Sequence, residues 1–130
     1  MKRIDLKDGS YVMVKTAFDR KTMREYRLEM DKKSTSEVMH DKEGKAVLDD
    51  NGIPKKKKIY DSLQTELAFD VMIKNMVVSA FIEKEVEGKK ITESIEINTD
   101  YFDSMNTDDW EELLNYCLSL IKKEEKEKKS

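Results

Sequence analysis

The stretch NTDYFDSMNTDDWEELLNYCLSLIKK, residues 98–123, contains two helix-start signals only eight residues apart. Asn98-Thr99-Asp100 and Asn106-Thr107-Asp108 each offer side-chain oxygens that can cap the free N–H groups of a helix. The first signal predicts a single helical turn over residues 100–105. The second predicts an amphipathic helix, because apolar residues recur at spacings of three and four: Trp110, Leu113, Leu114, Cys117, Leu120 and Ile121. We therefore expect a helical corner, in which a short turn docks aromatic side chains before a terminal helix begins.

The terminal helix is acidic. Residues 98–121 contain six acidic residues and no basic one. Four of the acids crowd the start of the second helix, where the positive end of the helix dipole favours them: Asp108, Asp109, Glu111 and Glu112. Two interpretations remain open: the helix contacts a positive partner or a neighbouring copy, or it presents a solvated face. Residues 126–130 are predicted to be a charged, disordered tail that follows a single domain over residues 1–125.

The N-terminal segment predicts a β-hairpin followed by a helix. In RIDLKDGSYVMVK, residues 3–15, two strand-like runs flank Asp8-Gly9, a pair that favours a tight turn. Asp19 is a candidate cap for the helix that follows. Met23, Tyr26 and Met30 fall on one face of that helix, where they are either packing residues or an adaptable surface for an apolar partner segment.

Residues 31–59 differ in character from both neighbouring segments. They are rich in lysine, contain the only proline and lack a sustained apolar period. A structureless loop of this length is unusual in a compact domain, so a flexible hairpin arm is expected, with a turn at residues 42–44. The lysine run at residues 55–58 has no interleaved arginine or aromatic residue, which argues against nucleic-acid binding.

A long apolar helix is predicted over residues 61–82, with Asp61 and Gln64 forming a capping box. Its buried stripe is expected to consist of Leu63, Leu67, Val71, Val78 and Phe81, widened by Ala68, Met72 and Met76. Asp70 can pair with Lys74 on the remaining face of this helix. The same two charges argue against a membrane span. A strand or extended connection around Gly88 should follow. The predicted fold is α+β: an N-terminal β-hairpin with a small helical bundle, a Lys-rich mobile arm and a C-terminal acidic amphipathic helix.

The sequence offers no catalytic constellation. His40 is the only histidine, and Cys117, the only cysteine, falls on the apolar face of the last helix. One cysteine excludes an internal disulfide and favours a reducing, intracellular setting. The four glycines are isolated, so no phosphate-binding glycine loop is present. We therefore predict a protein that is not an enzyme and that has no cofactor and no metal site.

The order of these elements resembles the tail assembly chaperones of long-tailed bacteriophages. The resemblance rests on the hairpin IDLKDGSYVMVK, the helix ending MVVSAFIEKEVEGKKI and the C-terminal pattern FDSMNTDDWEEL. It covers residues 2–30 and 61–125, and the arm at 31–59 departs from it as an insertion. The resemblance implies a non-enzymatic protein of the host cell cytoplasm that binds the tape measure protein, recruits major tail protein and is absent from the mature virion. Many members of that family are also made in a longer form by ribosomal frameshifting, and the lysine pairs at residues 122–123 and 128–129 are compatible with such a form.

Two other functions remain open at this level. A small acidic phage-encoded inhibitor could use the acidic helix to mimic nucleic acid, and a structural tail or connector subunit would remain in the virion. The candidate partner-binding residues fall into two groups. Tyr26, Met30, Trp110 and Leu114 are candidates for packing or docking, and Asp108, Asp109 and Glu112 are candidates for a charged contact, including self-association.

Overall fold

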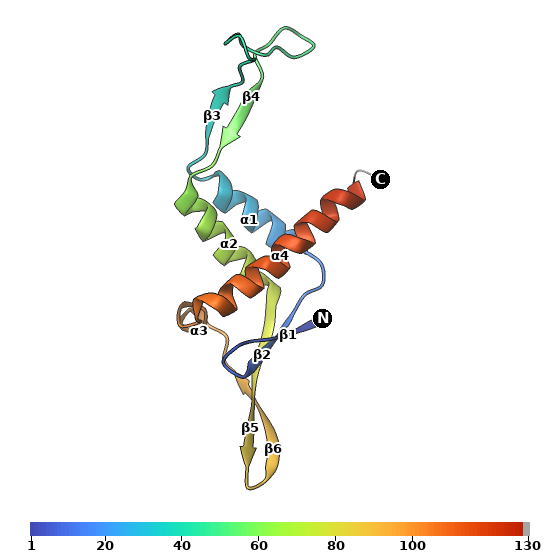
Figure 1. The fold of residues 1–130 in the computed structure, drawn as a ribbon, viewed down its shortest axis with the longest axis vertical. Helices are drawn as coiled ribbons and strands as arrows, with labels where there is room; N and C mark the ends of the chain where they lie inside the picture. Colours follow the sequence, from blue (N-terminus) through green and yellow to red (C-terminus); the bar gives the residue numbers. More distant parts are fainter. Residues whose placement is uncertain (129–130) are drawn as a thin grey trace.

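A four-stranded antiparallel sheet forms the lower half of the molecule in the computed structural model, which describes residues 1–128 (Figure 1). β1 (Lys2–Asp5) and β2 (Ser10–Val14) form the predicted N-terminal hairpin, and Gly9 at its turn has a φ of 89°. β5 (Val77–Val86) pairs with β2, and β6 (Lys89–Ile95) pairs with β5, so the strand order is β1-β2-β5-β6. The predicted hairpin and the extended segment around Gly88 are therefore confirmed.

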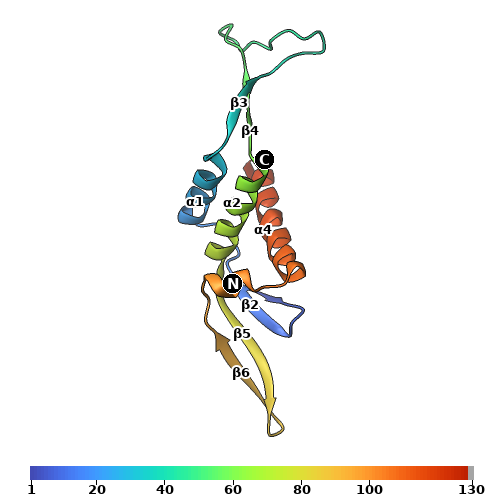
Figure 2. The same cartoon turned by 90° about the vertical axis from the view of Figure 1, so that its left-hand side faces the viewer.

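Three helices form a small bundle above the sheet. α1 (Arg20–Asp31) packs along α2 (Ser62–Met76), and α4 (Thr107–Lys128) packs on the other side of α2 (Figure 2). The backbone N–H of Thr22 donates to the Asp19 carboxylate at 2.8 Å, and that of Gln64 donates to Asp61 at 2.9 Å. Asp19 and Asp61 thus cap their helices as predicted, but the capping box is incomplete, because the Gln64 side chain bonds Glu29 on α1. The chain has the α+β fold expected from its sequence, with an N-terminal hairpin and a C-terminal helix.

The core lies where the sheet meets α2 and α4. One face of the sheet, one side of α2 and the apolar face of α4 meet there, and the buried side chains include Ile4, Val12, Val14, Met72, Met76, Leu113 and Cys117. Phe102 from α3 (Thr99–Asp103) joins the same cluster. The apolar spacing of the terminal helix therefore serves mainly to pack α4 against the rest of the fold.

The predicted helix over residues 61–82 is wrong in its last third. α2 ends at Met76, and β5 begins at Val77 without an intervening loop. The β-branched pair Val77-Val78 favours extended backbone, and β5 gains strand partners on both sides. The N–H of Lys15 also donates to the Met76 carbonyl at 3.0 Å, which ties the end of the helix to the sheet. Tertiary pairing thus overrides the helical pattern.

The predicted buried stripe of α2 is correct at Ala68, Met72 and Met76, which are buried, and wrong at Leu63, Leu67 and Val78. Leu63 is 61% exposed and Leu67 is 43% exposed, whereas Gln64 is buried. The Gln64 amide donates to the Glu29 carboxylate on α1 at 2.7 Å, so this buried polar group has a partner. Asp70 does not form the expected pair with Lys74; it accepts a hydrogen bond from the indole of Trp110. Contact with α1 therefore buries a polar side chain at the start of α2 in place of the neighbouring leucine.

The Lys-rich segment forms a two-stranded arm that projects from the upper end of the bundle (Figure 1). β3 (Thr35–Val38) pairs with β4 (Lys56–Ile59), and two turns at Gly44 and Gly52 complete the arm. Nearly all of its residues are exposed. The hairpin arm and its turn at residues 42–44 are confirmed, while the flexibility of residues 31–59 stays a prediction.

The double helix-start signal produces the expected corner. Asn98 accepts from the N–H of Tyr101 at 2.9 Å to cap α3, and Asn106 accepts from the N–H of Asp109 at 2.8 Å to cap α4. The tail prediction needs correction, because α4 continues to Lys128 and residues 126–128 are helical. Residues 129–130 lie outside the described part of the chain.

Candidate functional site

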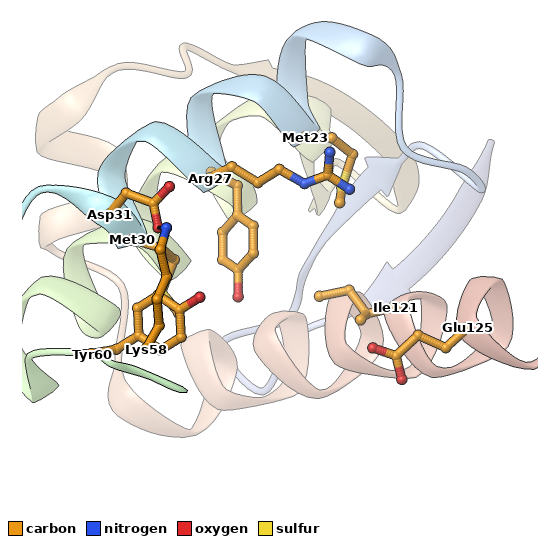
Figure 3. Close-up of a pocket in the computed structure, with 9 residues that line it drawn as sticks. Met23, Arg27, Met30, Asp31, Lys58, Tyr60, Ile121 and Glu125 are labelled. Carbon is orange, nitrogen blue, oxygen red and sulfur yellow. Dashed lines mark hydrogen bonds and ion pairs between the residues drawn. The ribbon is translucent and has the colours of Figure 1, made fainter. Parts of the chain in front are cut away.

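A groove of about 400 Å³ lies between α1 and the C-terminal half of α4, and the base of the arm closes one end of it. Its apolar lining consists of Met23, Tyr26, Met30, Tyr60 and Ile121. Figure 3 shows Met30, Lys58 and Tyr60 at one end of the groove and Ile121 with Glu125 at the other. The three residues that the sequence places on one face of the first helix therefore form one wall of this groove.

Contacts with α2 hold α1 in position. Tyr26 stacks on Phe69 of α2 with ring centroids 6.3 Å apart, and burial raises the pKa of the Tyr26 hydroxyl. Asn75 of α2 donates to the Glu25 carboxylate at 2.7 Å, in addition to the bond from Gln64 to Glu29. These bonds lie along the length of α1. The methionine wall is thus presented on a firmly anchored helix, while the methionine side chains themselves remain adaptable.

The rim of the groove is charged. Lys58 of the arm and Asp31 at the end of α1 form an ion pair at 2.8 Å, and this pair raises the pKa of Lys58. Arg27 and Glu125 add one charge of each sign to the rim. An apolar floor with a mixed charged rim fits an amphipathic helix, whose apolar side chains enter the groove and whose polar flanks stay in water.

The acidic residues of α4 have three different environments. Asp109 is only 1% exposed, and its carboxylate accepts from the backbone N–H of Lys7 at 2.7 Å and from the Asn106 amide at 2.9 Å. Asp108 is exposed and pairs with the Lys7 ammonium at 3.0 Å. Glu112 is exposed. The expectation that Asp109 contacts a partner is therefore wrong: Asp109 anchors the β1–β2 turn to the start of α4.

Trp110 and Leu114 are half-buried and pack against the core cluster. The Trp110 indole N–H donates to Asp70 at 3.1 Å and so links α4 to α2. Neither residue lines the groove. Of the four predicted docking residues, only Tyr26 and Met30 lie together in it.

The sequence did not indicate the opposite wall of the groove. Ile121 belongs to the periodic apolar face of α4, and periodicity alone cannot separate its groove contact from core packing. Tyr60 and Lys58 reach the site because the arm leaves the bundle beside α1, and no local signal marks this arrangement. In the sequence, only the end of the lysine-rich segment at residue 59 indicates that the arm returns to the bundle near this point.

The other candidate groups have simple environments. Cys117 is buried in the core, and burial raises the pKa of its thiol to about 12. Within residues 1–128, no three His, Cys, Asp or Glu side chains gather closely enough to hold a metal ion. No helix in this part of the chain is both long and apolar enough to cross a membrane.

The chain shows no match to any protein-family model, curated protein or solved structure with which it was compared.

Proposed function

We propose that this chain is a non-enzymatic tail assembly chaperone of a long-tailed bacteriophage. In this proposal it binds the tape measure protein through the groove between α1 and α4 and recruits major tail protein during tail assembly. It acts in the host cell cytoplasm and is absent from the mature virion. The observation that carries the proposal is the groove wall formed by Met23, Tyr26 and Met30 on one anchored helix.

The chemistry of the groove suits a long helical partner. Its volume of about 400 Å³ accommodates a few large apolar side chains, such as those at positions i, i+3 and i+4 of a helix. Methionine side chains adjust to different shapes at low cost, so one groove can accept many similar segments. A protein that coats a long helical partner must recognise such segments repeatedly, without a strict sequence motif.

The inhibitor alternative gains less support. A nucleic-acid mimic needs a broad array of exposed acids, but Asp109 faces inward and Asp108 is paired with Lys7. The number of acids that α4 presents freely is therefore smaller than its sequence suggests.

The test is affinity capture of the tagged chain from cells during virion assembly, followed by mass spectrometry. The wild type should recover a long, helix-rich tape-measure-like protein. Met30→Glu places a charge in the groove and should reduce this recovery by about tenfold. Leu63→Glu is the matched control, because Leu63 is 61% exposed on α2 and does not line the groove. Circular dichroism should show both variants folded.

Three results would contradict the proposal. The first is recovery of as much partner by Met30→Glu as by the wild type. The second is an eluate that contains a host nuclease or DNA-binding protein instead. The third is retention of the chain in purified virions. The last result would favour a structural tail or connector subunit.

A further inference from the structure

A second cavity, of about 330 Å³, lies where the β1–β2 turn and the end of β6 meet the corner between α3 and α4. It shares no lining residue with the groove between α1 and α4. Ligand sites in proteins usually enclose about 300–1,000 Å³, so this volume suits a single long side chain and not a whole helix. We call it the corner cavity.

Three apolar side chains line the corner cavity: Leu6 beside the β1–β2 turn, Ile95 at the end of β6 and Met105 after α3. Leu6 is buried in the core, and Ile95 and Met105 are half-buried against it. Core packing therefore holds these walls in place. Walls of this kind suit the methylene stem of a long charged side chain, which packs on apolar surface while its head stays in a polar environment.

Asp8 brings a negative oxygen to the same cavity. Its Oδ1 atom accepts from the backbone N–H of Ser10 at 2.9 Å and from the Ser10 hydroxyl, so its Oδ2 atom is left free. Within residues 1–128, Asp8 forms no ion pair, and no lysine or arginine of this part of the chain lines the cavity. The corner cavity therefore holds a carboxylate that lacks a counter-charge.

The Tyr101 side chain forms a further part of the wall, and its hydroxyl is buried with no hydrogen-bond partner among the described residues. Burial and then the charges of Asp8 and Asp109 raise the pKa of Tyr101 to about 12, so the hydroxyl stays protonated beside two carboxylates. Asp109 is already bound by Lys7 and Asn106. A buried hydroxyl without a partner is costly, and an N–H donor placed between Asp8 and Tyr101 removes that cost.

We propose that the corner cavity is an anchor site for one lysine side chain of a partner protein. The stem of the lysine lies along Leu6, Ile95 and Met105, and its ammonium donates to Asp8 Oδ2 and to the Tyr101 hydroxyl. The site lies outside the groove, so the proposal does not depend on which partner the groove binds.

The polar groups of the cavity favour lysine over other cations. A guanidinium prefers a carboxylate with two free oxygens, which it binds as a fork, whereas Asp8 offers one. An ammonium is a compact charge that one oxygen can bind. A free diamine carries a second ammonium, which would lie against the apolar walls without a carboxylate to receive it. A single lysine side chain on a protein meets neither difficulty.

The test is a titration of the isotope-labelled chain with N-acetyl-lysine N-methylamide, followed by amide NMR spectra. The signals of the β1–β2 turn and the α3–α4 corner should shift saturably, with a dissociation constant of about 1–10 mM because one side chain makes few contacts. The norleucine analogue, which keeps the stem and lacks the ammonium, should bind about tenfold more weakly. The arginine analogue and putrescine should also bind more weakly than the lysine analogue.

Three variants locate the binding. Asp8→Asn keeps an oxygen for the Ser10 N–H but removes the charge, so affinity for the lysine analogue should fall by about tenfold. Tyr101→Phe keeps the ring, and affinity should fall by about fivefold without a loss of stability, because the hydroxyl has no partner in the free chain. Asp103→Asn is the matched control: this exposed acid of α3 does not line the cavity, and the variant should bind like the wild type. The same spectra report whether each variant is folded.

Any of four results would overturn the proposal. The lysine analogue could leave the signals of the corner unshifted, or the norleucine analogue could bind as tightly as the lysine analogue. Asp8→Asn could bind like the wild type, or lose no more affinity than Asp103→Asn. Finally, tighter binding of the arginine analogue or of putrescine would assign the cavity to a different cation.

Discussion

The buried carboxylate of Asp109 should be one of the costliest acidic side chains to remove. It accepts from the Lys7 backbone N–H at 2.7 Å and from the Asn106 amide at 2.9 Å, and it is 1% exposed. In the Asp109→Ala variant both donors lose their acceptor, and the Asp109 carboxylate is the acceptor that the structure gives the Lys7 N–H. Each hydrogen bond to this buried, charged acceptor contributes about 1.5–3 kcal/mol. We therefore expect the free energy of unfolding to fall by about 3 kcal/mol.

The neighbouring residue provides a matched control. Asp108 lies in the same helical turn, but its carboxylate is exposed and pairs with the Lys7 ammonium at 3.0 Å. Exposed pairs contribute about 0–1 kcal/mol, so Asp108→Ala should change stability little. Asp109→Asn should fall between the two variants, because one side-chain oxygen remains to accept the Lys7 N–H.

Urea and thermal unfolding monitored by circular dichroism measure these differences directly. A loss of about 3 kcal/mol in a chain of this size lowers the midpoint of thermal unfolding by about 10 °C. The reasoning is refuted if Asp109→Ala and Asp108→Ala unfold within about 0.5 kcal/mol of each other, which is the usual scatter for surface substitutions. Loss of partner binding with unchanged stability in Asp109→Ala would instead return Asp109 to the interface.

Three further predictions concern single contacts. Trp110→Phe keeps the ring packing but removes the indole N–H that Asp70 accepts, so urea unfolding should show a loss of about 1 kcal/mol, and unchanged stability would mean that this bond contributes nothing net. Burial raises the pKa of Cys117 to about 12, so its thiol should resist iodoacetamide near pH 8 until denaturant is added, and rapid labelling of the native chain would contradict this burial. The free energy of unfolding should fall as pH rises above about 8.5, because the thiol ionises there in the unfolded chain and not in the folded one. Gly9→Ala should cost about 1 kcal/mol in thermal unfolding because Gly9 has a φ of 89°, whereas an unchanged midpoint would show that the turn relaxes.

Local signals predicted most of the fold. Asp19, Asp61, Asn98 and Asn106 cap their helices as their sequence contexts indicate, because a cap depends only on groups within three residues. The turn at Gly9 is equally local. The sequence could therefore place the starts of the helices and the N-terminal hairpin.

Non-local contacts decided what the sequence could not show. The apolar run continues through Met76, so periodicity favours an unbroken helix. The switch to strand depends on pairing with residues 10–14 and 89–95, which lie far away in the sequence. Gln64 is buried in place of Leu63 because Glu29 of α1 provides its partner. In the sequence, Asp109 cannot be distinguished from the other acids of the first turn of α4, because its burial depends on the β1–β2 turn packing beside it.

The candidate site was half predictable for the same reason. One helix face carries Met23, Tyr26 and Met30, and a spacing rule finds such a face. The opposing residues come from α4 and from the base of the arm, so the groove exists only after the bundle has packed.

The direct join between α2 and β5 turns residues 62–86 into one continuous strut. At 1.5 Å per helical residue and about 3.3 Å per strand residue, its contour length is about 55 Å. The arm leaves from one end of this strut, and the β5–β6 hairpin forms the other end (Figure 1). No linker inside the strut can absorb a displacement, since the Met76 carbonyl is held by Lys15 at the join. The strut therefore sets the spacing between the base of the arm and the β5–β6 hairpin, and a load applied at one of these ends passes along the backbone to the other.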